Sequence, residues 1–103
     1  MDYATHPRLP EILKEWHEAG RTTFEQQFKA LDYDAHSPKR ALVKRKYVCL
    51  DEDSGGVWLL DRGTGEIYHI KSAYGVPDKR KHLGHLETVT GADLHRLRWW
   101  YLK

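Results

Sequence analysis

Residues 44–72 read KRKYVCLDEDSGGVWLLDRGTGEIYHIKS, and this stretch determines the fold of the chain. It holds three runs rich in strand-forming residues, at 47–50, 57–60 and 67–70. Two connections separate the runs, DEDSGG and DRGTG, and both consist of residues that turns favour. The spacing predicts an antiparallel meander against which the rest of the chain packs.

The connection at residues 61–65 is the most specific local feature of the sequence. Asp61 is suited to accept backbone hydrogen bonds in a tight turn, and either Gly63 or Gly65 can supply the left-handed residue that closes a bulged hairpin. Both faces of the preceding run, VWLL, are apolar. A strand that is apolar on both faces is typical of the centre of a sheet, so we expect a central strand with one face beneath helices.

The part of the chain before the sheet has helical character. Ile12 and Trp16 recur at helical spacing, and Gly20 follows where a C-terminal cap would stand. A second amphipathic pattern covers residues 23–32, and a stretch rich in turn formers follows it. These features predict a helical hairpin and a linker within residues 1–38.

The end of the chain admits two interpretations. Thr90 can cap a helix and Asp93 can lie in its first turn, which predicts a helix over residues 94–102. The same residues can instead form a last strand, with TGAD as its hairpin turn. The helix is the favoured interpretation, and the strand remains open.

Together these patterns predict the fold class α+β. We expect a small three- to four-stranded antiparallel sheet, with the N-terminal helical hairpin packed on one face and a C-terminal helix. A length of 103 residues suits a single domain spanning 1–103, in which 1–38 form the hairpin and linker and 39–103 the sheet and last helix.

Composition narrows the class of protein. Hydrophobic residues at 40% and charged residues at 31% are typical of a folded, water-soluble chain. No apolar run approaches the roughly 20 residues that cross a membrane, and the first residues lack the features of a signal peptide. A single cysteine, Cys49, is consistent with a reducing compartment, so we expect a cytoplasmic protein without membrane contact.

The residue patterns of catalytic and metal sites are weak here. Cys49 lies between apolar residues in a strand, where it is an ordinary core residue. If the chain around them is a strand, His82 and His85 point to opposite faces and cannot share a metal ion. We therefore expect no enzymatic activity, no catalytic residues, no metal and no cofactor.

Charge is distributed unevenly along the chain. Residues 1–38 carry four Lys and Arg against seven Asp and Glu, whereas residues 39–103 carry thirteen against eight. The excess of cations lies in short clusters that also border aromatic residues, which suits phosphate contacts and base stacking. We therefore predict a small regulatory protein that binds nucleic acid, either DNA or RNA. The predicted contact residues are Lys44, Arg45, Lys46, Lys79, Arg80, Lys81, Arg96 and Arg98.

The alternative function is binding to a protein partner. Trp99, Trp100 and Tyr101 would serve as exposed anchors, because interface hot spots are rich in such aromatic residues. An inhibitor or adaptor of the kind that phages and mobile elements encode would fit this alternative. Salt dependence separates the two functions, since phosphate contacts release counterions and aromatic anchors do not. The sequence does not determine the oligomeric state.

Overall fold

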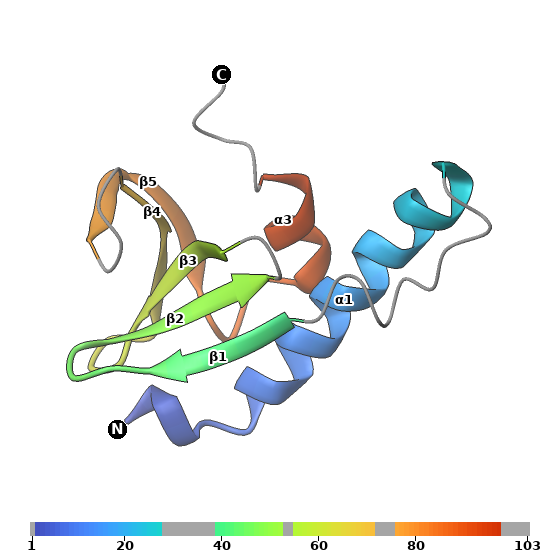
Figure 1. Ribbon diagram of the computed structural model, residues 1–103. Coiled ribbons are helices and arrows are strands. Elements are labelled where there is room, and N and C mark those ends of the chain that lie inside the picture. Colours follow the sequence, from blue (N-terminus) through green and yellow to red (C-terminus); the bar gives the residue numbers. More distant parts are fainter. Residues whose placement is uncertain (1, 28–38, 53–54, 72–75, 98–103) are drawn as a thin grey trace.

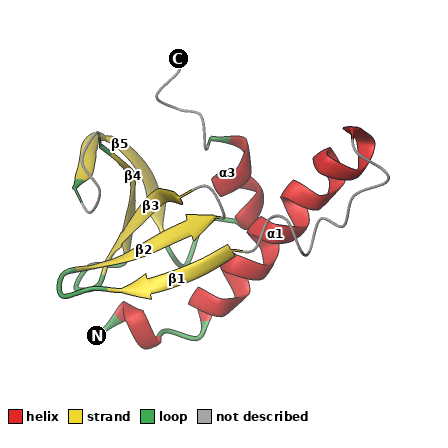
Figure 2. Ribbon diagram, in the orientation of Figure 1, coloured by secondary structure: helices red, strands yellow, loops and turns green. Residues whose placement is uncertain are grey.

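The structure, a computed structural model, describes residues 2–27, 39–52, 55–71 and 76–97. Within them, a curved antiparallel sheet carries a layer of helices on one side (Figures 1 and 2). The elements in chain order are η1 (Tyr3–Thr5), α1 (Arg8–Gln27), β1 (Lys39–Val43), β2 (Tyr47–Glu52), β3 (Gly55–Asp61), β4 (Glu66–Ile70), β5 (Pro77–His85) and α3 (Gly91–Arg96). The predicted α+β class with an antiparallel sheet is confirmed.

The strands form a simple meander in the order β1-β2-β3-β4-β5. β3 is the central strand, as its two apolar faces predicted. The predicted number of strands, three to four, is wrong, because the described residues form a five-stranded sheet. The error arose at both edges, where β1 and β5 carry too many charged residues to resemble strands.

β1 and β2 form a hairpin that the sequence pattern did not reveal. Val43 pairs with Val48, and the backbone N–H of Lys44 donates to the carbonyl of Tyr47 at 2.9 Å. Residues 44–46 are therefore the tip of the hairpin, which we call the basic tip. In the described residues positive φ occurs only at glycine, so this turn forms without the left-handed residue typical of short hairpins.

β5 contains a large bulge. Asp78 pairs with His69, and His82 pairs with the preceding Tyr68, so residues 79–81 have no partner on β4. We call residues 79–81 the basic bulge. Bulges are typical of edge strands, where they interrupt pairing and redirect side chains.

The predicted helical hairpin is wrong over the described residues, because α1 is one continuous helix of 20 residues that runs through Gly20. A glycine inside a helix costs only about 1 kcal/mol relative to alanine. That cost is smaller than the cost of ending one helix and starting another. The last turns of α1 extend past the edge of the sheet (Figure 1). No helix within the described residues is long and apolar enough to cross a membrane.

The core lies between the helices and the face of the sheet that we call the inner face. Ile12 and Trp16 of α1 are fully buried there, as their helical spacing predicted, beside Leu94 of α3. The inner face contributes buried residues from β2, β3 and β4, among them Val48, Leu50, Trp58, Leu60 and Ile67. The indole N–H of Trp58 donates to the carbonyl of Leu94 at 3.3 Å.

α3 confirms that a helix follows the sheet, but it spans Gly91–Arg96, and residues 98–102 of the predicted helix lie outside the described residues. The side chain of Thr90 accepts from the backbone N–H of Asp93, and the Asp93 carboxylate accepts from the backbone of Thr90, so the cap is reciprocal. Gly91 packs directly against α1, since a Cβ atom built on it would lie 2.1 Å from the backbone nitrogen of Trp16. Its backbone N–H donates to Glu15 at 3.1 Å.

Candidate nucleic-acid interface

The opposite side of the sheet, the outer face, bears a row of paired residues from all five strands. Because directly paired residues share a face, the register assigns Leu42, Cys49, Leu59, Tyr68 and His82 to this row. Tyr47 lies two residues from Cys49 on β2 and therefore shares the outer face. Cys49 and Leu59 are buried, whereas Tyr47 and Tyr68 are partly exposed.

Two lysines from separate elements converge on the two tyrosines. The ammonium of Lys79, in the basic bulge, lies 4.2 Å from the ring centroid of Tyr68 and 5.9 Å from that of Tyr47. The ammonium of Lys46, in the basic tip, lies 5.5 Å from the ring centroid of Tyr47. We call Lys46, Tyr47, Tyr68 and Lys79 the basic–aromatic site. Two of the three predicted cation groups therefore meet at one place on the outer face.

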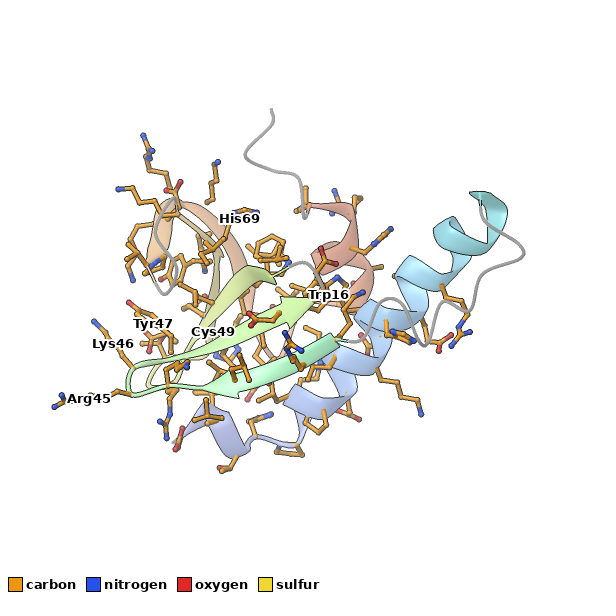
Figure 3. The ribbon with its side chains drawn as sticks, viewed as in Figure 1. Trp16, Arg45, Lys46, Tyr47, Cys49 and His69 are labelled. Carbon is orange, nitrogen blue, oxygen red and sulfur yellow. The ribbon has the colours of Figure 1, made fainter. Side chains whose placement is uncertain are left out.

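The basic tip is exposed and firmly held. Arg45 and Lys46 extend from the end of the hairpin, away from the body of the molecule (Figure 3). The guanidinium of Arg62 donates to the carbonyl of Lys44 at 2.7 Å, and the backbone N–H of Arg62 donates to the carbonyl of Lys46 at 3.2 Å. The β3–β4 turn thus fixes the backbone of the tip, while the lysine and arginine side chains remain in solvent.

Arg62 also holds the N-terminal segment against this turn. Its guanidinium donates to both carboxylate oxygens of Asp2, at 3.0 and 2.5 Å. The hydrogen bond from Arg62 lowers the pKa of Asp2 to about 2, with a further contribution from the backbone N–H of Ala4. Three segments that are distant in sequence therefore meet beside the basic tip.

In the basic bulge, Asp78 organises the backbone. Its carboxylate accepts from the backbone N–H of Arg80 at 3.0 Å, and it lies 3.4 Å from the guanidinium of Arg80 and 4.0 Å from the ammonium of Lys81. Burial acts to raise the pKa of Asp78, but the contacts with Arg80 and Lys81 outweigh it and lower the pKa. Asp78 therefore stays ionised and fixes the bulge from which Lys79 projects.

The cations of the basic tip and Lys79 differ from most other cations of the described residues, because no carboxylate pairs with them. Within the described part of the chain, no Asp or Glu forms an ion pair with Lys44, Arg45, Lys46 or Lys79. Arg80 and Lys81 are paired with Asp78, and Arg96 is paired with Asp93. The basic tip and Lys79 thus bring together four cations without a carboxylate partner among the described residues, whereas Lys14, Arg40 and Lys71, which also form no ion pair there, belong to other parts of the chain.

A histidine–carboxylate pair borders the site. Nε2 of His82 lies 2.5 Å from Oε2 of Glu66, and the His82 ring centroid is 5.1 Å from that of Tyr68. In the described part of the chain, two acidic residues neighbour the tyrosines: Glu66, whose carboxylate contacts His82, and Asp61, which pairs with Tyr47 across β2 and β3 and accepts from the backbone N–H groups of Gly63 and Thr64. Within the described residues, no group of three His, Cys, Asp or Glu side chains is arranged to hold a metal ion.

The remaining predicted residues do not join the site. Arg96 belongs to α3, on the helical side of the sheet, and is separated from the outer face by the core. Arg98 and the predicted protein-binding residues Trp99, Trp100 and Tyr101 lie outside the described residues. Comparisons with protein-family models, with curated proteins and with solved structures find no match for this chain.

Sequence reasoning missed the two tyrosines and the His82–Glu66 pair. Tyr47 and Tyr68 are distant in sequence, and their common face follows only from the register of β2, β3 and β4. One signal was available for the basic tip. Three consecutive cations interrupt the apolar run between Val43 and Tyr47, and such an interruption between two strand-like runs is typical of a turn.

Proposed function

We propose that this protein binds nucleic acid without catalysis, through the outer face of its sheet. The observation that carries the proposal is the convergence of Lys46 and Lys79 on the rings of Tyr47 and Tyr68. Phosphate contacts require accessible cations, and these cations are exposed or projecting and have no carboxylate partner among the described residues.

The electrostatic repulsion among these cations favours a ligand with negative charge. Four cations in the basic tip and at Lys79 repel one another, and none of them forms an ion pair with a carboxylate on the described residues. A phosphate backbone would relieve it and would release counterions, which is the main source of affinity in such complexes. The two aromatic rings add flat surfaces between the cations, as base-stacking proteins use them.

The experiment measures binding by the fluorescence anisotropy of labelled DNA and RNA of about 12 nucleotides, both single-stranded and double-stranded. The measurement is repeated from about 50 to 200 mM salt. The test variant is Lys46→Gln with Lys79→Gln. The matched control is Lys14→Gln with Arg96→Gln, which removes the same charge from the helical side. We expect the test variant to lose affinity and to reduce the salt slope by about 1.4 on single strands and about 1.8 on duplexes, and the control to bind nearly as tightly as the wild-type protein.

Two results would overturn the proposal. If the wild-type protein binds no strand at the lowest salt, nucleic acid is not its ligand. If the test and control variants weaken binding equally, net charge alone accounts for binding and the outer face is not the interface. Thermal melts of both variants establish that each remains folded.

A further inference from the structure

We infer that the nucleic acid is single-stranded, and that one of its bases stacks on Tyr68 in the position that the Lys79 side chain fills in the unbound protein. This inference rests on the proposed function and adds a base-binding site to it. The ligand class is an unpaired nucleobase within a polyanionic strand.

The geometry at Tyr68 is that of an aromatic face covered by a movable group. The Lys79 ammonium lies 4.2 Å from the ring centroid, which is the distance of a direct cation–π contact. Lys79 itself is exposed and belongs to a bulge that has no partner on β4, so its side chain is free to rotate away. A base that takes its place finds a flat, partly exposed ring.

Displacement gives Lys79 a second role. A flexible ammonium released from Tyr68 and without a carboxylate partner among the described residues is suited to pair with the phosphate next to the stacked base. Lys46 occupies the corresponding position at Tyr47, 5.5 Å from that ring, on the side of the basic tip. The site therefore alternates aromatic and cationic groups, which matches the alternation of bases and phosphates along a single strand.

The same geometry disfavours a double helix as the ligand. Bases in a duplex are stacked on one another, so their flat faces are not available to Tyr68. A two-stranded ribbon can enter the major groove, but the basic tip is hydrogen-bonded to Arg62 on the β3–β4 turn and does not stand free of the sheet. Duplex binding is then limited to phosphate contacts along the outer face.

The charged groups around Tyr68 are compatible with a base stacked on its ring. His82, on β5, presents its ring 5.1 Å from Tyr68 and is held by Glu66 of β4. The Glu66 carboxylate is thereby engaged with His82. Asp61, opposite Tyr47, accepts hydrogen bonds from the backbone of the β3–β4 turn. A strand entering the site therefore meets ring faces and ammonium groups, while both neighbouring carboxylates are engaged within the protein.

The experiment compares two probes of equal charge. One is a labelled thymidine strand of about 12 nucleotides, and the other is an abasic strand of the same length, which carries the phosphates and sugars without bases. The protein variants are Tyr68→Leu, which removes the ring, and Tyr68→Phe, which retains it. Both are first shown to melt as cooperatively as the wild-type protein.

We expect the wild-type protein to bind the thymidine strand about tenfold more tightly than the abasic strand. Tyr68→Leu should abolish this preference while retaining the affinity for the abasic strand, and Tyr68→Phe should preserve it. Lys79→Gln should lower the salt slope for the thymidine strand by about 0.7, the value for one phosphate contact on a single strand.

The outcomes separate the inference from the proposed function. Equal affinity of the wild-type protein for both strands would overturn the stacking site and leave phosphate binding intact. A preference that survives in Tyr68→Leu would likewise overturn the assignment to Tyr68. Binding to neither strand would overturn the proposed function itself. Tighter binding to a duplex of the same length would overturn single-strand selectivity.

Discussion

The guanidinium of Arg62 donates two hydrogen bonds, of 3.0 and 2.5 Å, to the carboxylate of Asp2, which lies 60 positions away in the sequence. The contact lowers the pKa of Asp2 from 3.8 to about 2. A depressed carboxyl pKa stabilises the folded state above the pKa of the unfolded chain, and this contribution is lost as pH falls from about 4 toward 2. The N-terminal segment should therefore detach from the β3–β4 turn in acid.

Asp2→Asn tests this directly. Above about pH 4 the variant should melt at a lower temperature than the wild-type protein, and the difference should shrink toward pH 2 as Asp2 becomes protonated in both states. Because the pair is exposed, added salt should reduce the difference as well. Glu11→Gln, which removes an exposed carboxylate of α1, serves as the control. A difference in melting temperature that is constant over this pH range would contradict the assignment.

Gly65 and Gly63 should respond differently to the same substitution. Gly65 has φ of +81°, and a Cβ atom on it would lie 2.5 Å from the His85 ring and 2.8 Å from the Tyr3 ring. Gly65→Ala should destabilise the protein by about 1–3 kcal/mol. Gly63→Ala should change the free energy of unfolding by less than about 0.5 kcal/mol, since its Cβ would meet only Asp61 at 3.5 Å. Urea denaturation of the two variants measures both values, and equal losses would contradict the turn geometry.

Gly91 should tolerate no side chain. A Cβ atom would lie 2.1 Å from the nitrogen of Trp16 and 2.2 Å from the carbonyl carbon of Glu15, and both are backbone atoms that cannot rotate away. Gly91→Ala should destabilise the protein by about 3 kcal/mol or more, because α3 must move away from α1. Ala92→Ser, at the next and exposed position, should have little effect. A Gly91→Ala variant of wild-type stability would mean that the helices do not touch as described.

The ion pair between Lys39 and Glu52 is buried, with only 4% and 7% of the two side chains exposed. Its Nζ–Oε2 distance is 3.7 Å, and the Lys39 ammonium also lies 5.3 Å from the Trp16 ring centroid. Lys39→Met should destabilise the protein by about 3–5 kcal/mol, because it removes the Lys39 ammonium from a buried carboxylate. Replacing both residues with methionine should recover much of that loss. If denaturation gives the double variant the same or lower stability than the single one, the pair has no such role.

The sheet interior, the β3–β4 turn and one helix cap could be predicted because each depends on local sequence rules. The turn at Asp61, the central β3 and the cap at Thr90 each follow from a few neighbouring residues and were all found in the structure. The helix end predicted at Gly20 was wrong, because a glycine can either end a helix or lie within one. The choice depends on tertiary packing that a local pattern does not contain.

The candidate site was predicted only in part, for a physical reason. Clusters of cations are visible in the sequence, so the basic tip and the basic bulge were both named in advance as charged groups. Their convergence depends on strand register, which sets Tyr47 and Tyr68 on one face, and on the bulge that directs Lys79 over Tyr68. Neither the strand register nor the bulge can be predicted from the composition of the sequence or the spacing of its residues.

The helical layer combines α1, which precedes the sheet, with α3, which follows it, and Gly91 joins them by backbone contact. Every strand, by contrast, pairs with a neighbour in sequence. Short-range pairings form early and long-range ones late, because closing a longer loop costs more entropy. We therefore expect the meander to form first during synthesis. The part of its inner face that Leu94 of α3 covers would stay exposed until α3 has left the ribosome, and aggregation is favoured in that interval.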